Sequence, residues 1–347
     1  MALRFLTASE ASSEYRKTDY FAQMNYIELA FRLNTLGQAY KANESCDRLR
    51  SRLLKQYQSL TRSFTAYEKD VLRFYFRRLY EILNNKAPAL IPNKANINLI
   101  KLAEGVDWDY PYTINHSIII PTKFLRGLID LYRQFHYQIT QIPSQVWNPT
   151  RPQFETIDRK VAVLCHELIH IIQRNKTLYP AHNRILDYAY TQLWSFEPIT
   201  KDQIRFRHAN EAQYFNALTN PDGYNFQWIV PVYNHETNYN TLFLPLLSRS
   251  QDNRPIGVLV EVTKQGDNYL VGSHWNEIDK IKRYAQKFYG LNKQLYHPNE
   301  ILCHLLSDYV ILDTIWSDVD IDFGYRTFYA LINEKFISRQ YRPYQNR

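Results

Sequence analysis

The chain has 347 residues, of which 45% are hydrophobic and 22% charged, and 42 basic against 34 acidic side chains leave a formal net charge of +8. Its 28 tyrosines and 18 phenylalanines exclude a disordered chain, and only 9 glycines exclude a collagen-like one. Three cysteines are too few for a disulfide framework and indicate a reducing compartment. The basic charge is spread along the chain, so it permits an acidic partner without indicating one.

The first half of the chain is predicted to be mostly helical, with two short strands. Thr65 and Glu68 have the spacing of a capping box, which is typical of a helix N-terminus. Apolar residues at helical spacing follow, and short apolar runs bounded by turn residues come next. The expected elements are helices over 13–60, a helix from 65 to 83, strands over 97–102 and 117–121, a helix over 123–139, a loop over 143–152, and a strong helix from Thr156 or Asp158 to about 175.

The second half is predicted to contain an antiparallel β segment between helices. Residues 220–223 read as a turn, and residues 265–268 read as the turn of a β-hairpin. The expected elements are strands over 226–233, 242–247, 257–263 and 269–272, and helices over 277–288, 298–316 and 325–338. We therefore expect an N-terminal helical extension over 1–64 and a second unit over 65–347, with a β-rich insertion at about 221–275.

The apolar stretches of the chain are short. Runs such as 117–121 and 161–165 are far below the ~18 residues that a membrane span needs. The first six residues are too few for a signal-peptide core, and Glu10 and Glu14 follow them. We expect a protein without a membrane span that does not use the signal-peptide route of secretion.

His166, Glu167 and His170 form an H-E-x-x-H motif within the strong helix, beside an apolar stripe. Positions i and i+4 project from one helix face, so both imidazoles can reach one Zn²⁺ at about 2.0–2.1 Å. Glu167 is not a ligand but can take a proton from a zinc-bound water and pass it to a leaving amine. The alternative is a chance pair of histidines at the edge of the core with a surface glutamate.

The third ligand of such a site must come from elsewhere in the chain. Metzincins would need Gly at 173 and His at 176, and this chain has Gln173 and Lys176, which excludes that class. Glu300 is the candidate, because Pro298 marks the first turn of a later helix and places Glu300 near its N-terminus. The alternative for Glu300 is a solvated carboxylate that interacts with the helix dipole.

Several neighbours compete with Glu300 for the ligand role. His297, His304 and Asp308 are rivals, although we favour His304 and Asp308 as groups that orient a ligand imidazole from behind. A cysteine ligand is a further alternative. Cys165 itself lies on the apolar stripe and is interpreted as a small buried hydrophobic residue.

The H-E-L-I-H sequence at 166–170, followed by Asn-Glu on a later helix, resembles the gluzincin branch of zinc metallopeptidases. More closely, it is similar to uncharacterised zincin-like proteins of large DNA viruses and some protists, because further segments occur in the same order over roughly 65–310. These segments are 111–113 ahead of the strand 117–121, then 166–174, 220–222 and 297–301. Cys303 and His304 depart from that pattern, which favours a small residue followed by an acid at the corresponding positions.

The resemblance implies an α+β, zincin-like fold that is mostly helical, with a small sheet and the antiparallel β insertion. It implies a Zn²⁺-dependent peptidase that hydrolyses peptide or protein substrates, with His166, His170 and Glu300 as ligands and Glu167 as general base. A cytoplasmic or virion-associated protein fits this reading.

Hydrolysis also needs a donor that stabilises the oxyanion, and the sequence does not rank the candidates. The candidates are Tyr112, His116, His235, His274, Tyr296 and His297. The strand 117–121 is expected either to pair with an extended substrate or to be an ordinary core strand.

A second function from another class stays open. The chain would then be a structural component of a large assembly, such as a virion, that keeps the zincin fold without turnover. The intact Glu167 favours the enzyme, because a purely structural zinc site needs no general base. A nucleic-acid partner rests on charge alone and is not expected.

Overall fold

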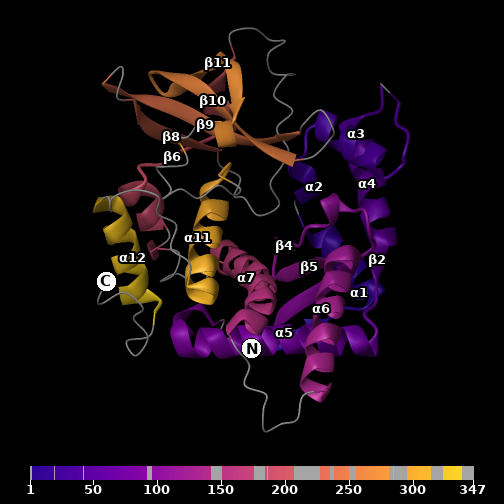
Figure 1. Ribbon diagram of the computed structural model, residues 1–347. Coiled ribbons are helices and arrows are strands. Elements are labelled where there is room, and N and C mark those ends of the chain that lie inside the picture. Colours follow the sequence, from indigo (N-terminus) through magenta and orange to yellow (C-terminus); the bar gives the residue numbers. More distant parts are fainter. Residues whose placement is uncertain are drawn as a thin grey trace.

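The computed structural model of the chain is drawn in Figure 1. It describes residues 2–18, 20–41, 43–91, 96–141, 151–175, 184–185, 187–206, 227–234, 238–249, 255–280, 284, 295–313 and 323–337. The expected turn at 220–223 and His235 lie outside these residues, as do most of the expected loop at 143–152 and the side chain of His274.

Four helices near the N-terminus form one layer, on the right of Figure 1. Each of the three longer helices begins at a side-chain cap, provided by Thr7, Asn25 and Ser45 in turn, which satisfies a free backbone N–H of the first helical turn. The helices are α1 (Ala8–Lys17), α2 (Tyr20–Gln23), α3 (Tyr26–Thr35) and α4 (Cys46–Leu60). The sequence pattern predicted helices over this region, and that prediction is confirmed.

A five-stranded sheet lies beside these helices. Its strands are β1 (Leu3–Phe5), β2 (Thr61–Arg62), β3 (Ile97–Leu102), β4 (Tyr112–Ile114) and β5 (Ser117–Pro121). Strand β5 pairs in parallel with β3 on one side and antiparallel with β4 on the other. Both edges of β5 are therefore taken, so the expectation that 117–121 pairs with an extended substrate is wrong, and β5 is a core strand. Within the described residues, β4 pairs with β5 alone and forms the edge.

The two faces of this sheet pack against different helices. Ile100, Tyr112 and Ile119 point into the cluster formed by α1–α4, whereas Leu99 and Ile118 point into the larger core. This alternation follows from the period of two along a strand. The larger core contains α5 (Ala66–Lys86), which begins at the expected Thr65–Glu68 capping box, together with α6 (Thr122–Gln141) and α7 (Arg151–Arg174).

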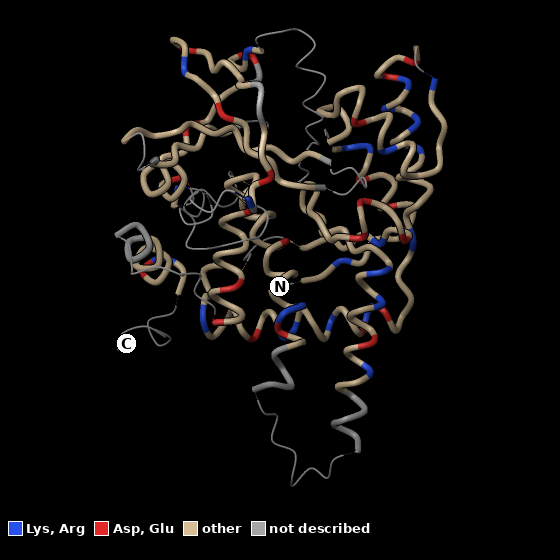
Figure 2. Tube along the Cα trace, turned by 45° about the horizontal axis from the view of Figure 1, so that its top comes forward, with Lys and Arg blue, Asp and Glu red and all other residues tan. Residues whose placement is uncertain are grey.

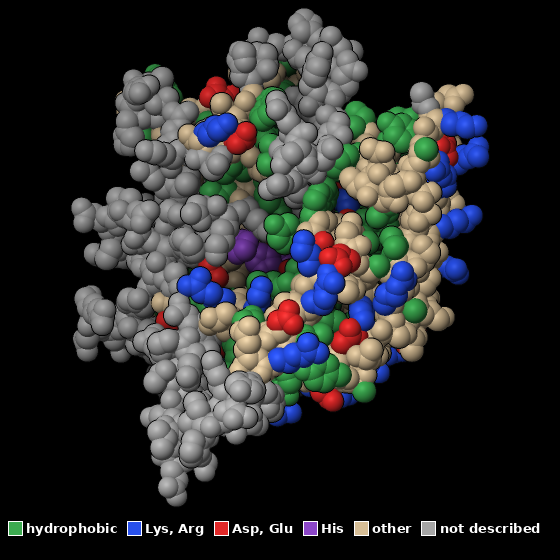
Figure 3. Space-filling model, turned by 45° about the vertical axis from the view of Figure 1, so that its right-hand side comes forward, with side chains coloured by type: hydrophobic (Ala, Val, Ile, Leu, Met, Phe, Trp, Pro, Cys, Tyr) green, Lys and Arg blue, Asp and Glu red, His purple; other side chains and the backbone are tan. Residues whose placement is uncertain are grey.

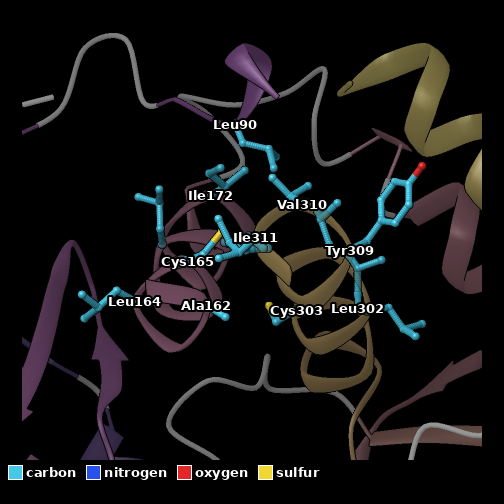
Figure 4. Close-up of a cluster of buried hydrophobic side chains, with 14 of the residues drawn as sticks. Leu90, Ala162, Leu164, Cys165, Ile172, Leu302, Cys303, Tyr309, Val310 and Ile311 are labelled. Atoms are coloured by element: carbon cyan, nitrogen blue, oxygen red, sulfur yellow. The ribbon is translucent and has the colours of Figure 1, made fainter. Parts of the chain in front are cut away.

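Helices α7 and α11 (Pro298–Leu312) lie side by side at the centre of the molecule (Figure 1). Figure 4 shows Cys165 and Ile172 of α7 facing Ile311 of α11, with Val310 alongside. All four side chains are buried. In the described part of the chain the other helical elements are α12 (Phe323–Lys335) and the short turns at Pro88–Leu90, Asp107–Asp109, Ala189–Leu193, Lys201–Gln203 and Ile278–Lys280.

A second, six-stranded sheet covers the top of Figure 1. Its strands are β6 (Glu197–Ile199), β7 (Ile204–Arg205), β8 (Gln227–Asn234), β9 (Tyr239–Arg249), β10 (Pro255–Gln265) and β11 (Asn268–Glu277). One face encloses a cluster of its own that includes Val258 and Val260, and the other adds Val230 and Leu259 to the large core. The hairpin turn expected at 265–268 joins β10 to β11 as predicted.

The fold-class prediction is wrong in the extent of its sheets. The described residues form a five-stranded and a six-stranded sheet, whereas one small sheet with an insertion was expected. They do not show a zincin-like fold. The reason is that β1, β2, β4, β6 and β7 have only two or three residues each, too few to give a strand period in the sequence. Strands β8–β11 are also longer than their apolar runs suggested, because their ends are polar.

The division of the chain at residue 64 stays a prediction. Strand β2, which precedes that residue, pairs with β3, which follows it. Among the described residues, no helix is both long and apolar enough to cross a membrane. Figure 2 shows Lys and Arg interspersed with Asp and Glu over most of the described elements.

Candidate metal centre

Helix α7 presents both histidines of the motif on its buried side. An apolar stripe fixes which face of the helix turns inward, and its members are Val161, Leu164, Cys165, Leu168, Ile171 and Ile172, all buried. The imidazoles next to this stripe are buried with it. His170 is fully buried and His166 is 6% exposed.

Helix α11 brings Glu300 to the same place. His297 caps its N-terminus, because Nδ1 of His297 accepts a hydrogen bond from the backbone N–H of Asn299, and Pro298 occupies the first turn. Glu300 therefore projects from the first turn of α11, and it is 1% exposed. The alternative of a solvated carboxylate does not agree with this burial.

Three donor atoms converge between the two helices. Nε2 of His166 lies 2.9 Å from Nε2 of His170 and 3.1 Å from Oε2 of Glu300. Nε2 of His170 lies 3.6 Å from the same oxygen. Two ligand atoms about 2.0–2.1 Å from a tetrahedral Zn²⁺ are themselves about 3.3 Å apart. The triangle of donors has the size that one metal ion requires.

The charge balance of this triangle also suits a cation. Burial by itself would raise the pKa of Glu300, but His170 and His166 beside it outweigh burial and hold the pKa well below its usual value. The carboxylate is therefore ionised inside the core. A buried anion of this kind is tolerated only with a cationic partner or a metal ion.

Two further side chains border the triangle. His166 and His170 with Cys303, and His166 and Glu300 with His304, are groups whose donor atoms lie within 4.8 Å of one another. Sγ of Cys303 is 3.5 Å from Nδ1 of His170, the ring nitrogen that does not face Glu300. Burial raises the pKa of the Cys303 thiol to about 12, which disfavours a thiolate. Buried His166, His170, Cys303 and Glu300 thus form a cluster that can bind a metal ion.

Glu167 is held by the edge strand of the five-stranded sheet. The Thr113 hydroxyl on β4 lies 2.9 Å from Oε2 of Glu167 and 3.1 Å from its backbone carbonyl oxygen, and it can donate to either. Both residues are buried. Thr113 belongs to the 111–113 segment of the resemblance, but nothing in the sequence indicated its contact with Glu167.

A buried network behind His170 was also missed. Nδ1 of His170 lies 2.8 Å from Oε1 of Gln173, whose amide nitrogen donates to Tyr190 and to the backbone of Asn299. The sequence analysis used Gln173 only to exclude metzincins. Its spacing of three from His170 on one helix was the signal that could have identified it.

The other candidates fall into different places. Tyr112 points away from Glu167, and its hydroxyl lies 2.9 Å from that of Tyr15 in the N-terminal cluster. His297 serves as a helix cap, and Asp308 is buried further along α11, where its charge acts on Cys165. The ring of His304 packs on the ring of His166 at 4.4 Å between centroids. Of these four residues, His304 is the one the structure brings to the triangle.

Figure 3 shows histidine side chains in a hollow of the surface, between hydrophobic and basic side chains. The partial exposure of His166 agrees with a site that is close to solvent at one side. Neither protein-family models, nor curated proteins, nor solved structures give a match to this chain. The assignment of function therefore rests on the site itself.

Proposed function

We propose that this chain is a zinc-dependent metallopeptidase. The observation that carries the proposal is the triangle of Nε2 of His166, Nε2 of His170 and Oε2 of Glu300, with edges of 2.9, 3.1 and 3.6 Å. Two imidazoles and one carboxylate are a common set of three protein ligands in catalytic zinc sites, where the fourth position is left to water or substrate.

In this proposal His166, His170 and Glu300 hold the ion. Bound zinc would supply a Lewis acid that polarises the scissile carbonyl and lowers the pKa of water. Glu167 is the general base, which accepts a proton from the attacking water and donates it to the leaving amine. Thr113 supports this role, because its hydroxyl can donate to Oε2 of Glu167 and so fixes the position of the carboxylate.

One observation favours the second candidate, a structural zinc site in a larger assembly. His304 lies close enough to His166 and Glu300 to offer a fourth protein donor. Four protein ligands are typical of structural zinc sites, which leave no position for water. The two candidates therefore differ in whether the metal has an open position.

Zinc stoichiometry and cleavage of a peptide library, measured for wild type and Glu167→Gln, test the proposal. We expect one zinc per chain in both proteins and cleavage by wild type alone, because the substitution removes the base and leaves the ligands. Glu81→Gln, on the exposed side of α5, is the matched control and should cleave like wild type. Zinc binding without cleavage by wild type would instead support the structural candidate, and a wild type that binds no zinc would contradict both.

A further inference from the structure

The buried network behind His170 involves Gln173, Tyr190 and Asn299. We propose that Gln173 is a positioning residue that fixes the tautomer of His170, so that Nε2 of this imidazole keeps its lone pair for a metal ion. The inference rests on the metal centre of the proposed function, but not on peptide cleavage.

The argument begins at the backbone carbonyl of Asn299, which can only accept a hydrogen bond. It lies 3.3 Å from the amide group of Gln173, so the amide nitrogen must face it. The amide oxygen, Oε1, then faces Nδ1 of His170 at 2.8 Å. An oxygen acceptor requires a proton on Nδ1, and a neutral imidazole with Nδ1–H has its lone pair on Nε2.

Two other contacts keep the Gln173 amide in this orientation. The hydroxyl of Tyr190 accepts from Nε2 of Gln173 at 3.1 Å and donates to Oδ1 of Asn299 at 2.9 Å. The thiol of Cys303 lies 3.5 Å from Oε1 of Gln173, on the acceptor side. All of these side chains are buried, with Gln173 and Asn299 each 1% exposed. A flipped amide would place its oxygen against the carbonyl oxygen of Asn299, acceptor against acceptor, in a medium of low dielectric constant, which is costly.

His166 provides a contrast within the same site. Its Nδ1 is buried and has no hydrogen-bond partner in the described part of the chain, while its Nε2 lies 3.1 Å from Oε2 of Glu300. In the metal-free protein, Nε2–H of His166 can donate to that carboxylate. Metal binding then requires the proton of His166 to leave Nε2, whereas His170 already has the binding tautomer.

The tautomers can be observed directly in the metal-free protein. Long-range ¹⁵N–¹H spectra of histidine-labelled protein distinguish Nδ1–H from Nε2–H, and the spectrum of His170→Gln identifies the signals of His170. We expect Nδ1–H on His170 in wild type before and after Zn²⁺ is added. Nε2–H on His170 in the metal-free wild type would overturn the inference, and this measurement depends on no variant of Gln173.

The energetic consequence is tested by the affinity for Zn²⁺, measured in competition with a chromophoric chelator. Gln173→Met removes the acceptor at similar length, and we expect roughly 10–100-fold weaker binding, as for other groups that orient a ligand imidazole. Gln58→Met, which removes an amide that donates to the backbone of Ser12, is the matched control and should leave affinity unchanged.

Circular dichroism of the metal-free variants establishes that each is folded. Should Gln173→Met fail to fold, Tyr190→Phe replaces it, because loss of this hydroxyl loosens the amide and should weaken zinc binding several-fold. Unchanged affinity in the folded variant contradicts the inference. A protein with Gln173-dependent zinc binding that cleaves no peptide leaves the inference standing and contradicts only the peptidase.

Discussion

Glu300 and Cys303 lie one turn apart on α11, and both are buried beside His170. They approach different sides of the imidazole. Oε2 of Glu300 is 3.6 Å from Nε2 of His170, whereas Sγ of Cys303 is 3.5 Å from Nδ1. Since Nδ1 already faces Gln173, the carboxylate is the better placed of the two for a shared ion.

The first prediction compares these two residues. Glu300→Ala should weaken Zn²⁺ binding by more than the roughly 10–100-fold expected for loss of an outer hydrogen bond. Cys303→Ser, which keeps a donor near Gln173, should change the affinity by only a few-fold. Chelator competition measures both. The reverse order of effects would make Cys303 the ligand and remove Glu300 from the site.

The second prediction concerns His297 and pH. Burial lowers the pKa of His297 to about 4 from a usual 6.5. Between these pH values His297 binds a proton in the unfolded chain but not in the folded one. Its contribution to the free energy of unfolding is therefore fully present above pH 6.5 and falls as the pH drops towards 4. For metal-free protein we expect a loss of up to about 3 kcal/mol from this residue.

Urea unfolding between pH 7 and pH 4 measures this loss. His297→Asn is the comparison, because asparagine keeps a helix-capping acceptor and does not titrate. The variant should lose less stability over this range than wild type. If the free energy of unfolding fell equally with pH in the two proteins, His297 would not be the residue responsible.

At the scale of elements, the packing of α7 against α11 decides whether a site exists. The histidines belong to one helix and Glu300 to the other, 134 residues apart in sequence. The apolar contacts drawn in Figure 4 hold the helices together. A change in the core between them should therefore affect metal binding as well as stability.

Ile301, fully buried next to Glu300, tests this coupling. Ile301→Ala should lower the free energy of unfolding by about 2–5 kcal/mol and also weaken Zn²⁺ binding, because the cavity lets the start of α11 shift. Ile100→Ala is the matched control, since Ile100 is equally buried but belongs to the N-terminal cluster. It should cost similar stability at unchanged affinity. Denaturant unfolding measures the stability and chelator competition measures the affinity for Zn²⁺. If both variants lost the same stability and the same affinity, a specific coupling between this core and the site would be disproved.

At the scale of the whole molecule, a buried charge cluster joins the N-terminal helices to the loop ahead of β4. The guanidinium of Arg32 on α3 pairs with Glu28 at 2.9 Å and with Asp107. Asp107, Trp108 and Asp109 all have positive φ, a conformation that costs non-glycine residues about 1 kcal/mol or more each. Arg32 thus holds a strained loop that leads into the strand carrying Thr113.

The last prediction tests this cluster. Arg32→Met leaves two buried carboxylates without their cation and should cost about 3–5 kcal/mol of stability. Arg48→Met removes a guanidinium that pairs with Glu44 at 3.3 Å but is 74% exposed, and should cost at most about 1 kcal/mol. Denaturant unfolding compares them, and equal losses would argue against a special role for Arg32.

Much of the local structure could be predicted from the sequence. The strands over 97–102 and 117–121, the capping box at Thr65 and the hairpin at 265–268 all occur as predicted, because each depends on residues close together in the chain. The pairing of His166 with His170 was predictable for the same reason, since the spacing of four places both on one helix face.

The strand pairing and the contacts between distant segments became known only from the tertiary structure, because local sequence patterns do not encode them. The size of the two sheets depends on which strands pair, and strands of two or three residues leave no period to read. Three features of the site and core depend on contacts between segments far apart in sequence. They are the position of Glu300 beside the two histidines, the inward position of Arg32 and the contact of Gln173 with Asn299. The sequence determined which chemistry the helix α7 offers, and only the packing of α11 against it determined where the third donor lies, because that distance is set by the core and not by the spacing of residues.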